Sequence, residues 1–280
     1  TEQYPRSARL EEETIIMYSA KQWPFIVLSV ISIAFTACQV TMPSSTTIEP
    51  TVTATPLLVA TATASPTVDS PTPVSNQTLE QQTMNQQLIQ AAERGDTATV
   101  LQLLAAGAEI NSRDAAGRTP VMAATHGNQV ETVQTLIAAG ADINLQDNRQ
   151  DNPFLYAGAE GLLDILKLTI EAGANTKLTN RFGGTALIPA AERGPVAVVA
   201  ELLNRTDVDV NHVNNLGWTA LLEAIILGDG GPARTDVVRL LIEAGADVNL
   251  ADGQGVTPLA HARQRGYTAM IELLEAAGAE

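Results

Sequence analysis

The stretch GADINLQDNRQDNPFLYAGAEGLLDILKLTIEAGANTK, residues 140–177, contains two versions of one short motif, GADIN at 140–144 and GANTK at 173–177. The motif recurs outside this stretch as GAEIN at 107–111, DVDVN at 207–211 and GADVN at 245–249, and a final GAE stands at 278–280. The first three copies are 33 residues apart. Self-similarity at a period of this length predicts a stack of repeated structural units over residues 79–280.

Each unit is expected to hold two helices. An apolar segment with helical periodicity precedes each motif, and a turn followed by Thr-Pro-Leu or a relative comes after most of them. A threonine hydroxyl is expected to cap the first helix of four units, at Thr119, Thr185, Thr219 and Thr257. Pro120 and Pro258 then fall at the first helical position, where a missing N–H costs nothing.

Residues that tolerate a left-handed backbone are expected to end the helices. For the first helices these are Gly95, Gly161, Gly194 and Gly266, with Asn128 in the second unit. For the second helices they are Gly107, Gly140, Gly173, Gly245 and Gly278. An Asp or Asn suits the turn that begins each following unit, at Asp114, Asp147, Asn180, Asn214 and Asp252.

This pattern resembles the ankyrin repeat over some 200 residues. The resemblance implies an all-α solenoid of about six helix-turn-helix repeats joined by β-hairpin-like turns. The repeats are expected near 79–113, 114–146, 147–179, 180–213, 214–251 and 252–280. The first and last are polar, as capping repeats should be.

Ankyrin stacks use their hairpin tips and inner helices as a concave binding surface. Carried onto this sequence, the resemblance implies a contact with a protein partner at Arg149, Asp151, Arg181, Phe182, Leu216, Trp218, Ile226 and Leu227. A second interpretation is that Trp218 packs over a neighbouring hairpin, with Ile226 and Leu227 beneath an inserted loop at 227–235. That insertion and the unusual tip at 150–154 mark either the contact surface or neutral variation.

Composition restricts the other functions. The chain has 31 acidic and 16 basic residues, so no basic patch is expected for nucleic acid. The repeat domain has one serine, Ser112, and its histidines, His126, His212 and His261, fall in three different repeats. We therefore expect no enzyme, no metal and no cofactor, and a monomer that binds a protein. The alternatives are a spacer without a specific ligand and an enzyme with an unrecognised site.

The N-terminal part is expected to direct the chain out of the cytoplasm. Lys21, an uncharged apolar segment and small residues before Cys38 follow Met17, which is the layout of a secretory signal over 17–37. Residues 35–38, FTAC, resemble a lipobox. The resemblance implies a diacylglycerol thioether on Cys38 and a membrane location, the outer membrane facing the periplasm in a two-membrane bacterium. An uncleaved signal-anchor, ordinary cleavage and a non-secretory apolar segment are the alternatives.

The segments on either side of the signal have simpler assignments. Residues 1–16 carry no fold signal and are expected to be unstructured or to lie upstream of a true start at Met17. Residues 38–78 are rich in Thr, Pro and Ser, with Glu49 and Asp69 as their charges. Such a tract cannot bury enough apolar surface to offset the cost of ordering it, so we expect a disordered tether.

The lipid assignment is tested by replacing the cysteine. Cys38→Ser should abolish labelling with a radioactive fatty acid and leave an unprocessed precursor, because the thiol is the atom that is acylated. Labelling and the mass of the membrane-bound form are the two measurements. Normal processing together with membrane retention in this variant would rule out the lipoprotein interpretation.

Overall fold

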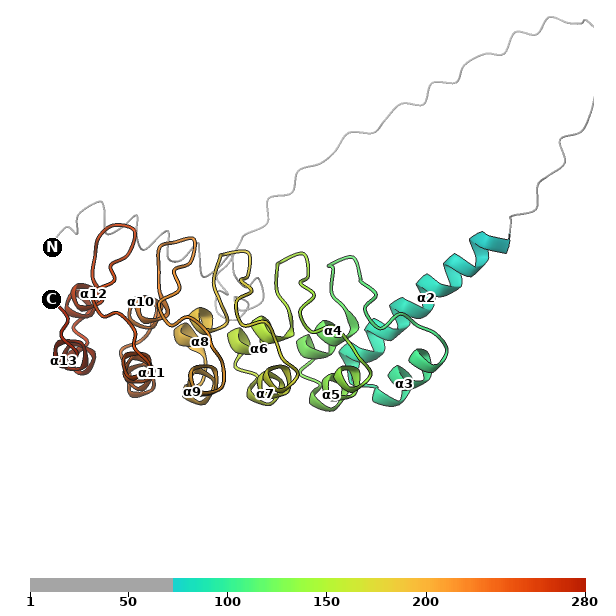
Figure 1. Ribbon diagram of the computed structural model, residues 1–280, viewed down its shortest axis with the longest axis horizontal. Coiled ribbons are helices and arrows are strands. Elements are labelled where there is room, and N and C mark those ends of the chain that lie inside the picture. Colours follow the sequence, from blue (N-terminus) through green and yellow to red (C-terminus); the bar gives the residue numbers. More distant parts are fainter. Residues whose placement is uncertain (1–72) are drawn as a thin grey trace, which may run out of the picture. The chain divides into compact units, whose positions relative to one another are not determined.

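The computed structural model describes residues 73–280, with side chains from Thr78 onward. Within this part the backbone forms twelve α-helices and no strands. The helices are α2 (Pro73–Arg94), α3 (Thr97–Ala105), α4 (Pro120–His126), α5 (Val130–Ala138), α6 (Pro153–Glu160), α7 (Leu163–Glu171), α8 (Leu187–Arg193), α9 (Val196–Arg205), α10 (Ala220–Ile226), α11 (Pro232–Glu243), α12 (Pro258–Arg265) and α13 (Thr268–Ala276). They pair in chain order into six units, repeats 1 to 6 (Figure 1). The all-α repeat solenoid is confirmed, whereas the expectations for residues 1–72 lie outside the described residues.

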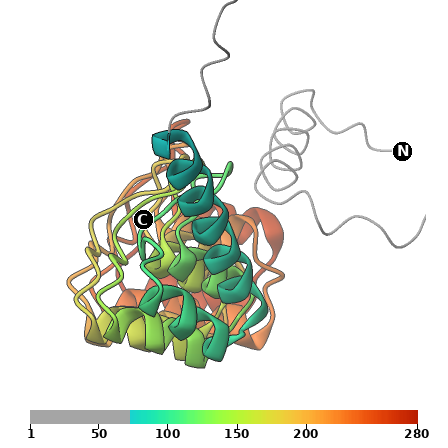
Figure 2. The ribbon, with the colours of Figure 1, turned by 90° about the vertical axis from the view of Figure 1, so that its right-hand side faces the viewer.

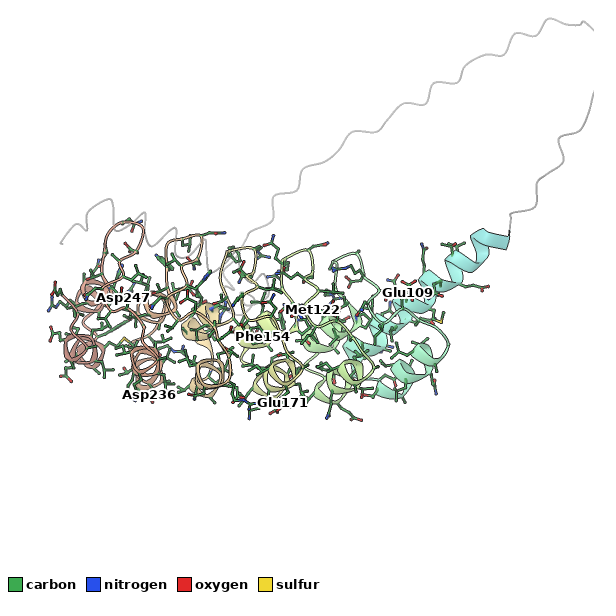
Figure 3. The ribbon with its side chains drawn as sticks, in the orientation of Figure 1. Glu109, Met122, Phe154, Glu171, Asp236 and Asp247 are labelled. Carbon is green, nitrogen blue, oxygen red and sulfur yellow. The ribbon has the colours of Figure 1, made fainter. Side chains whose placement is uncertain are left out.

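The repeats stand side by side in two helix layers (Figures 1 and 2). Helices α4, α6, α8, α10 and α12 form the inner layer, next to the hairpin loops, and α3, α5, α7, α9, α11 and α13 form the outer layer. Fully buried side chains such as Phe154, Leu166 and Leu202 fill the space between the layers (Figure 3 labels Phe154). Each repeat buries its apolar face only against its neighbours, so the stack folds as a linear array.

Most of the expected helix caps are present. The hydroxyls of Thr119, Thr219 and Thr257 each accept a hydrogen bond from the backbone N–H three residues on. Repeat 3 has a cap that the sequence pattern did not predict: the side-chain oxygen of Asn152 accepts from the Leu155 N–H at 2.8 Å. Asn152 thus replaces threonine as the N-cap, since both present an oxygen at the same position.

Repeat 4 departs from two expectations, in both cases because of a proline. Thr185 does not cap α8: the helix begins at Leu187, and the Thr185 hydroxyl is buried without a hydrogen bond. Pro189 has no N–H, so it fits best in the first turn of a helix, where backbone N–H groups make no intrahelical hydrogen bond. The helix therefore begins shortly before Pro189. Gly194 is extended, with φ −64° and ψ 155°, because the following Pro195 disfavours a helical backbone.

The other expected left-handed positions are confirmed. Gly161 and Gly266 end their inner helices with φ near 70°, and Asn128 takes φ 52° at the corresponding place in repeat 2. Asn is one of the few non-glycine residues that visits this region routinely.

Each hairpin is shaped by the residue that begins it. One side-chain oxygen of Asp114 accepts the N–H groups of Ala116 and Arg118, at 2.9 and 2.8 Å. The same two-fold acceptance, from the residues two and four positions further on, occurs at the start of every later hairpin, at Asp147, Asn180, Asn214 and Asp252. The turn expected at these positions is thereby confirmed, with its physical cause.

Asparagine side chains tie the repeats together at the loops that follow the outer helices. The Asn111 side chain accepts from the Asp142 N–H at 3.0 Å, and Asn144 accepts from the Asn175 N–H at 2.8 Å. Between repeats 3 and 4 this link is different, because Lys177 stands where the other motifs end in asparagine. There the Thr176 hydroxyl and the Lys177 ammonium both bind the exposed carboxylate of Asp207.

Repeat 1 has a helix where the others have a hairpin. Helix α2 is 22 residues long and begins at Pro73, upstream of residue 79 where we expected the first repeat to start. Its Asn85 side chain accepts from the Glu109 N–H at 2.9 Å and so supplies the link that a preceding repeat would make. Among the described residues, no helix combines the length and apolar character needed to cross a membrane.

The inserted loop of repeat 5 fastens three repeats together. The Arg234 guanidinium donates to the carbonyl oxygens of Ala191 and Gly194, at 2.8 Å each, at the C-terminal end of α8. From the other side the Tyr267 hydroxyl donates to the Gly228 carbonyl at 2.8 Å. The insertion therefore has a structural role that the sequence did not reveal.

We predict that Arg234→Ala lowers the free energy of unfolding by about 2 kcal/mol, since it removes two charge-assisted hydrogen bonds and leaves carbonyls at a helix end unpaired. Arg239→Ala on the same helix is the matched control, because its ion pair with Asp236 is half exposed and should contribute less than about 0.5 kcal/mol. Urea unfolding followed by circular dichroism measures both. Equal losses in the two variants would contradict the fastening role of the insertion.

Candidate protein-binding surface

The hairpin tips form one continuous row. The Asn148 N–H donates to the Ala116 carbonyl at 3.0 Å, the Arg181 N–H to the Arg149 carbonyl at 3.3 Å, and the Asn215 N–H to the Phe182 carbonyl at 2.9 Å. These bonds join the tips of repeats 2 to 5. The side chains at the tips are therefore held in a fixed order above the inner helices.

The tips of repeats 3 and 4 carry the charged and aromatic residues expected from the sequence. The Arg181 guanidinium lies over the Phe182 ring, 4.6 Å from its centroid. The Arg149 Nε atom is 3.9 Å from a carboxylate oxygen of Asp151, and all four side chains are partly buried. The structure thus brings Arg149, Asp151, Arg181 and Phe182 onto neighbouring tips.

Repeat 5 supplies the apolar part of the row. Leu216 and Trp218, on its hairpin, and Leu227, at the end of α10, are partly exposed. Ile226 is only 4% exposed, so it is removed from the surface and the expectation that it contacts a partner has no support. The apolar tip residues of repeat 5 lie next to Phe182 through the Asn215 bond.

The inner helices add an aromatic pair that the sequence analysis missed in part. The rings of His126 on α4 and Tyr156 on α6 are 4.0 Å apart and tilted by 32°. The sequence pattern gave no indication that His126 meets Tyr156. In an alignment of the repeats, Tyr156 occupies the position of Ala123 and Pro189, so its size was the available signal.

Charged groups surround this pair closely enough to alter one another's titration. Burial, together with Asp147, raises the pKa of Asp151 to about 6, although Arg149 and Arg181 oppose the shift. Burial raises the pKa of Tyr156 to about 12, aided by Glu160. Burial also lowers the pKa of His126 and raises that of Glu160, which has Arg193 and Arg149 nearby. The inner surface of repeats 2 to 4 is therefore a polar, mixed-charge floor.

Two buried pairs join the hairpin to the inner helix at equivalent positions. In repeat 6 the His261 Nε2 atom is 2.8 Å from an Asp252 oxygen. In repeat 5 the Asn214 amide donates to Glu223 at 3.0 Å. In both of these repeats, one hydrogen-bond partner is the first residue of the hairpin. The second partner lies nine residues further along the chain.

The arrangement offers little for catalysis. Asp252 and His261 are paired, but the serine of the repeat domain, Ser112, lies in the loop before repeat 2. Among residues 78–280, no three His, Cys, Asp or Glu side chains are grouped to hold a metal ion. What the surface presents is a row of anchored Arg, aromatic and aliphatic side chains, which is the composition of protein interfaces.

Charge is divided unequally between the two sides of the stack. Within residues 78–280, the outer helices and the loops beside them contain sixteen acidic and five basic residues, whereas α2, the hairpins and the inner helices contain nine acidic and eight basic ones. Glu171 and Asp236 illustrate the acidic side, away from the hairpins (Figure 3). An acidic partner is therefore repelled less from the hairpin side than from the outer side.

A helical repeat solenoid with a row of hairpin tips defines a class of proteins, and known members of this class resemble the chain in sequence. Residues 88–180 and 154–252 match the family model described as "Ankyrin repeats (3 copies)". The ankyrin repeat protein YahD of Escherichia coli (strain K12) is 45% identical over 189 residues, which cover 68% of this chain and 94% of YahD. The chain belongs to the ankyrin-repeat family.

Solved structures agree with this assignment. An ankyrin repeat domain from Acinetobacter baumannii AYE is 53% identical with a TM-score of 0.67, covering 69% of this chain and 98% of the domain. A chain in the structure of the predatory endopeptidase Bd0816 from Bdellovibrio bacteriovorus, in complex with immunity protein Bd3460, is 27% identical with a TM-score of 0.59, covering 68% of this chain and 96% of that one. Ankyrin repeats are protein–protein interaction modules and are typically not enzymes.

The buried pairs make a double-mutant prediction. Asn214→Asp places a carboxylate 3 Å from Glu223 and should destabilise the fold by at least about 2 kcal/mol above pH 8, where Glu223 is ionised as well. Adding Glu223→His recreates the pairing of repeat 6 and should restore most of the loss. Thermal unfolding of the two variants and the parent at pH 9 is the measurement. A double variant no more stable than Asn214→Asp would show that the two positions do not act as a pair.

Proposed function

We propose that this protein is a lipid-anchored, extracytoplasmic binding module that holds a protein partner on its central hairpin tips. Cys38 carries the lipid, the Thr/Pro-rich tract gives the repeat domain reach, and repeats 3 to 5 make the contact. The single observation that carries the proposal is the adjacency of Arg181, Phe182 and the repeat 5 tip, fixed by the bond between Asn215 and Phe182.

The chemistry of these side chains favours a protein partner. Arg and aromatic residues supply most of the energy in protein interfaces, and here they are pre-positioned, so little conformational freedom is lost on binding. Five side chains constitute the proposed contact, together with Leu227 at its border: Arg149, Arg181, Phe182, Leu216 and Trp218. Asp151 moderates the charge of Arg149 within this set.

The relatives add support of a general kind. One similar chain lies in a structure of an endopeptidase in complex with an immunity protein, which is a pairing of two proteins. The acidic outer side leaves the hairpin side as the more neutral face, on which a partner of either charge is tolerated. Together these observations favour recognition of a protein over that of nucleic acid or an anionic surface.

The test is a double substitution at the centre of the row. Arg181→Ala with Phe182→Ala should weaken binding at least tenfold, since truncation of a central anchor typically costs about 2 kcal/mol or more. The melting temperature should change little, because both side chains are partly exposed at a hairpin tip and the bonds that join the tips use backbone atoms. The partner is first captured by crosslinking from detergent-solubilised membranes, and its affinity is then measured by calorimetry.

Arg205→Ala is the matched control, because Arg205 is an exposed arginine on the outer helix α9. It should leave the affinity unchanged. Equal affinity of the double variant and the parent would move the contact away from the central tips. Weaker binding by Arg205→Ala than by the double variant would place the contact on the outer helices.

A further inference from the structure

Two carboxyl groups on the inner helices of repeats 4 and 5 each have a buried oxygen that accepts no hydrogen bond. Glu223, in the middle of α10, is 1% exposed. One of its oxygens accepts from Asn214, and the other is buried and receives no hydrogen bond. Glu192 on α8 also has a buried oxygen without a hydrogen bond. Native proteins rarely leave such groups unsatisfied, so the pair calls for an explanation.

The basic side chains nearby bind groups other than Glu223. Arg193 on α8 forms an ion pair with Glu192, with 3.4 Å between the guanidinium nitrogen and the carboxylate oxygen. The guanidinium of Arg234 on α11 donates its hydrogen bonds to the two carbonyl oxygens at the C-terminal end of α8. On α12, the equivalent position holds His261, whose ring is bound to Asp252. Glu223 is therefore paired with the neutral amide of Asn214, at the position where repeat 6 has the carboxylate of Asp252.

We propose that Glu223 and Glu192 form an acid-closed latch between the inner helices of repeats 4 and 5. With Glu223 protonated, α8 and α10 pack as observed. The inner helices of repeats 4 and 5, whose hairpins carry Phe182 and Trp218, are then held rigid. As the surroundings become neutral, opening of these helices is favoured, because opening lets Glu223 ionise in water. An effect of this opening on partner binding rests on the proposed function, but the latch itself does not.

The direction of the pH dependence follows from the titration of Glu223. Burial, with Glu192 as the second cause, raises its pKa in the closed state from 4.5 to about 8. At a pH between these two pKa values, Glu223 is ionised in the open state but protonated in the closed state. The opening equilibrium therefore rises by up to tenfold for each pH unit in this window and levels off above pH 8.

Hydrogen exchange of the full chain tests the latch without any partner. After correction for the intrinsic exchange rate, protection of amides in α8 and α10 should fall at least tenfold between pH 5.5 and 7.5. Glu223→Gln keeps the shape and the acceptor for Asn214 but cannot ionise, so its protection should change much less with pH than that of the parent. Glu192→Gln should reduce the fall without abolishing it, because burial is the larger cause.

Glu201→Gln on the outer helix α9 is the control and should behave as the parent does. Protection in α8 and α10 that is independent of pH in the parent would overturn the latch. The same pH dependence in Glu223→Gln as in the parent would overturn it as well. Either result leaves the proposed partner contact at Arg181 and Phe182 intact, so the two failures are distinguishable.

Discussion

One side-chain oxygen at the start of each hairpin accepts two backbone N–H groups, and the geometry of the whole stack depends on it. In repeat 2 this oxygen belongs to Asp114, and it fixes the loop as far as Arg118. A fixed loop can hydrogen-bond to the next loop, as the Asn148 N–H does with the Ala116 carbonyl. The ordered row of tips, and with it the proposed contact surface, follows from this repeated bond.

The side chain at this first hairpin position can also hydrogen-bond to the inner helix, and this bond differs between repeats 5 and 6. Asp252 meets His261, whereas Asn214 meets Glu223, so the donor and acceptor roles are exchanged between the two repeats. The exchange keeps one hydrogen bond but moves the carboxyl group from the hairpin to the inner helix. Repeat 5 therefore has a carboxyl group that is 1% exposed, and burial raises its pKa.

Function in this molecule rests on differences between repeats that share one backbone plan. Alanines on the inner helices allow close stacking, and the variable tip positions carry Arg149, Phe182 and Leu216. Most of the excess acidic charge lies on the outer layer, which leaves the hairpin side nearly neutral. A rigid plan with variable tips suits recognition of one protein by another, because binding then orders few side chains.

The period of the motifs, the threonine caps and the glycines at helix ends were sufficient to determine the solenoid and its six repeats, because these signals are local. They failed at Thr185 and Gly194, where Pro189 and Pro195 impose a stronger local constraint. Only the tertiary structure decided that Ile226 is buried, that Tyr156 stacks on His126 and that Arg234 fastens α8. Each of these contacts joins different repeats or depends on packing between them, and no pattern within one repeat can specify it.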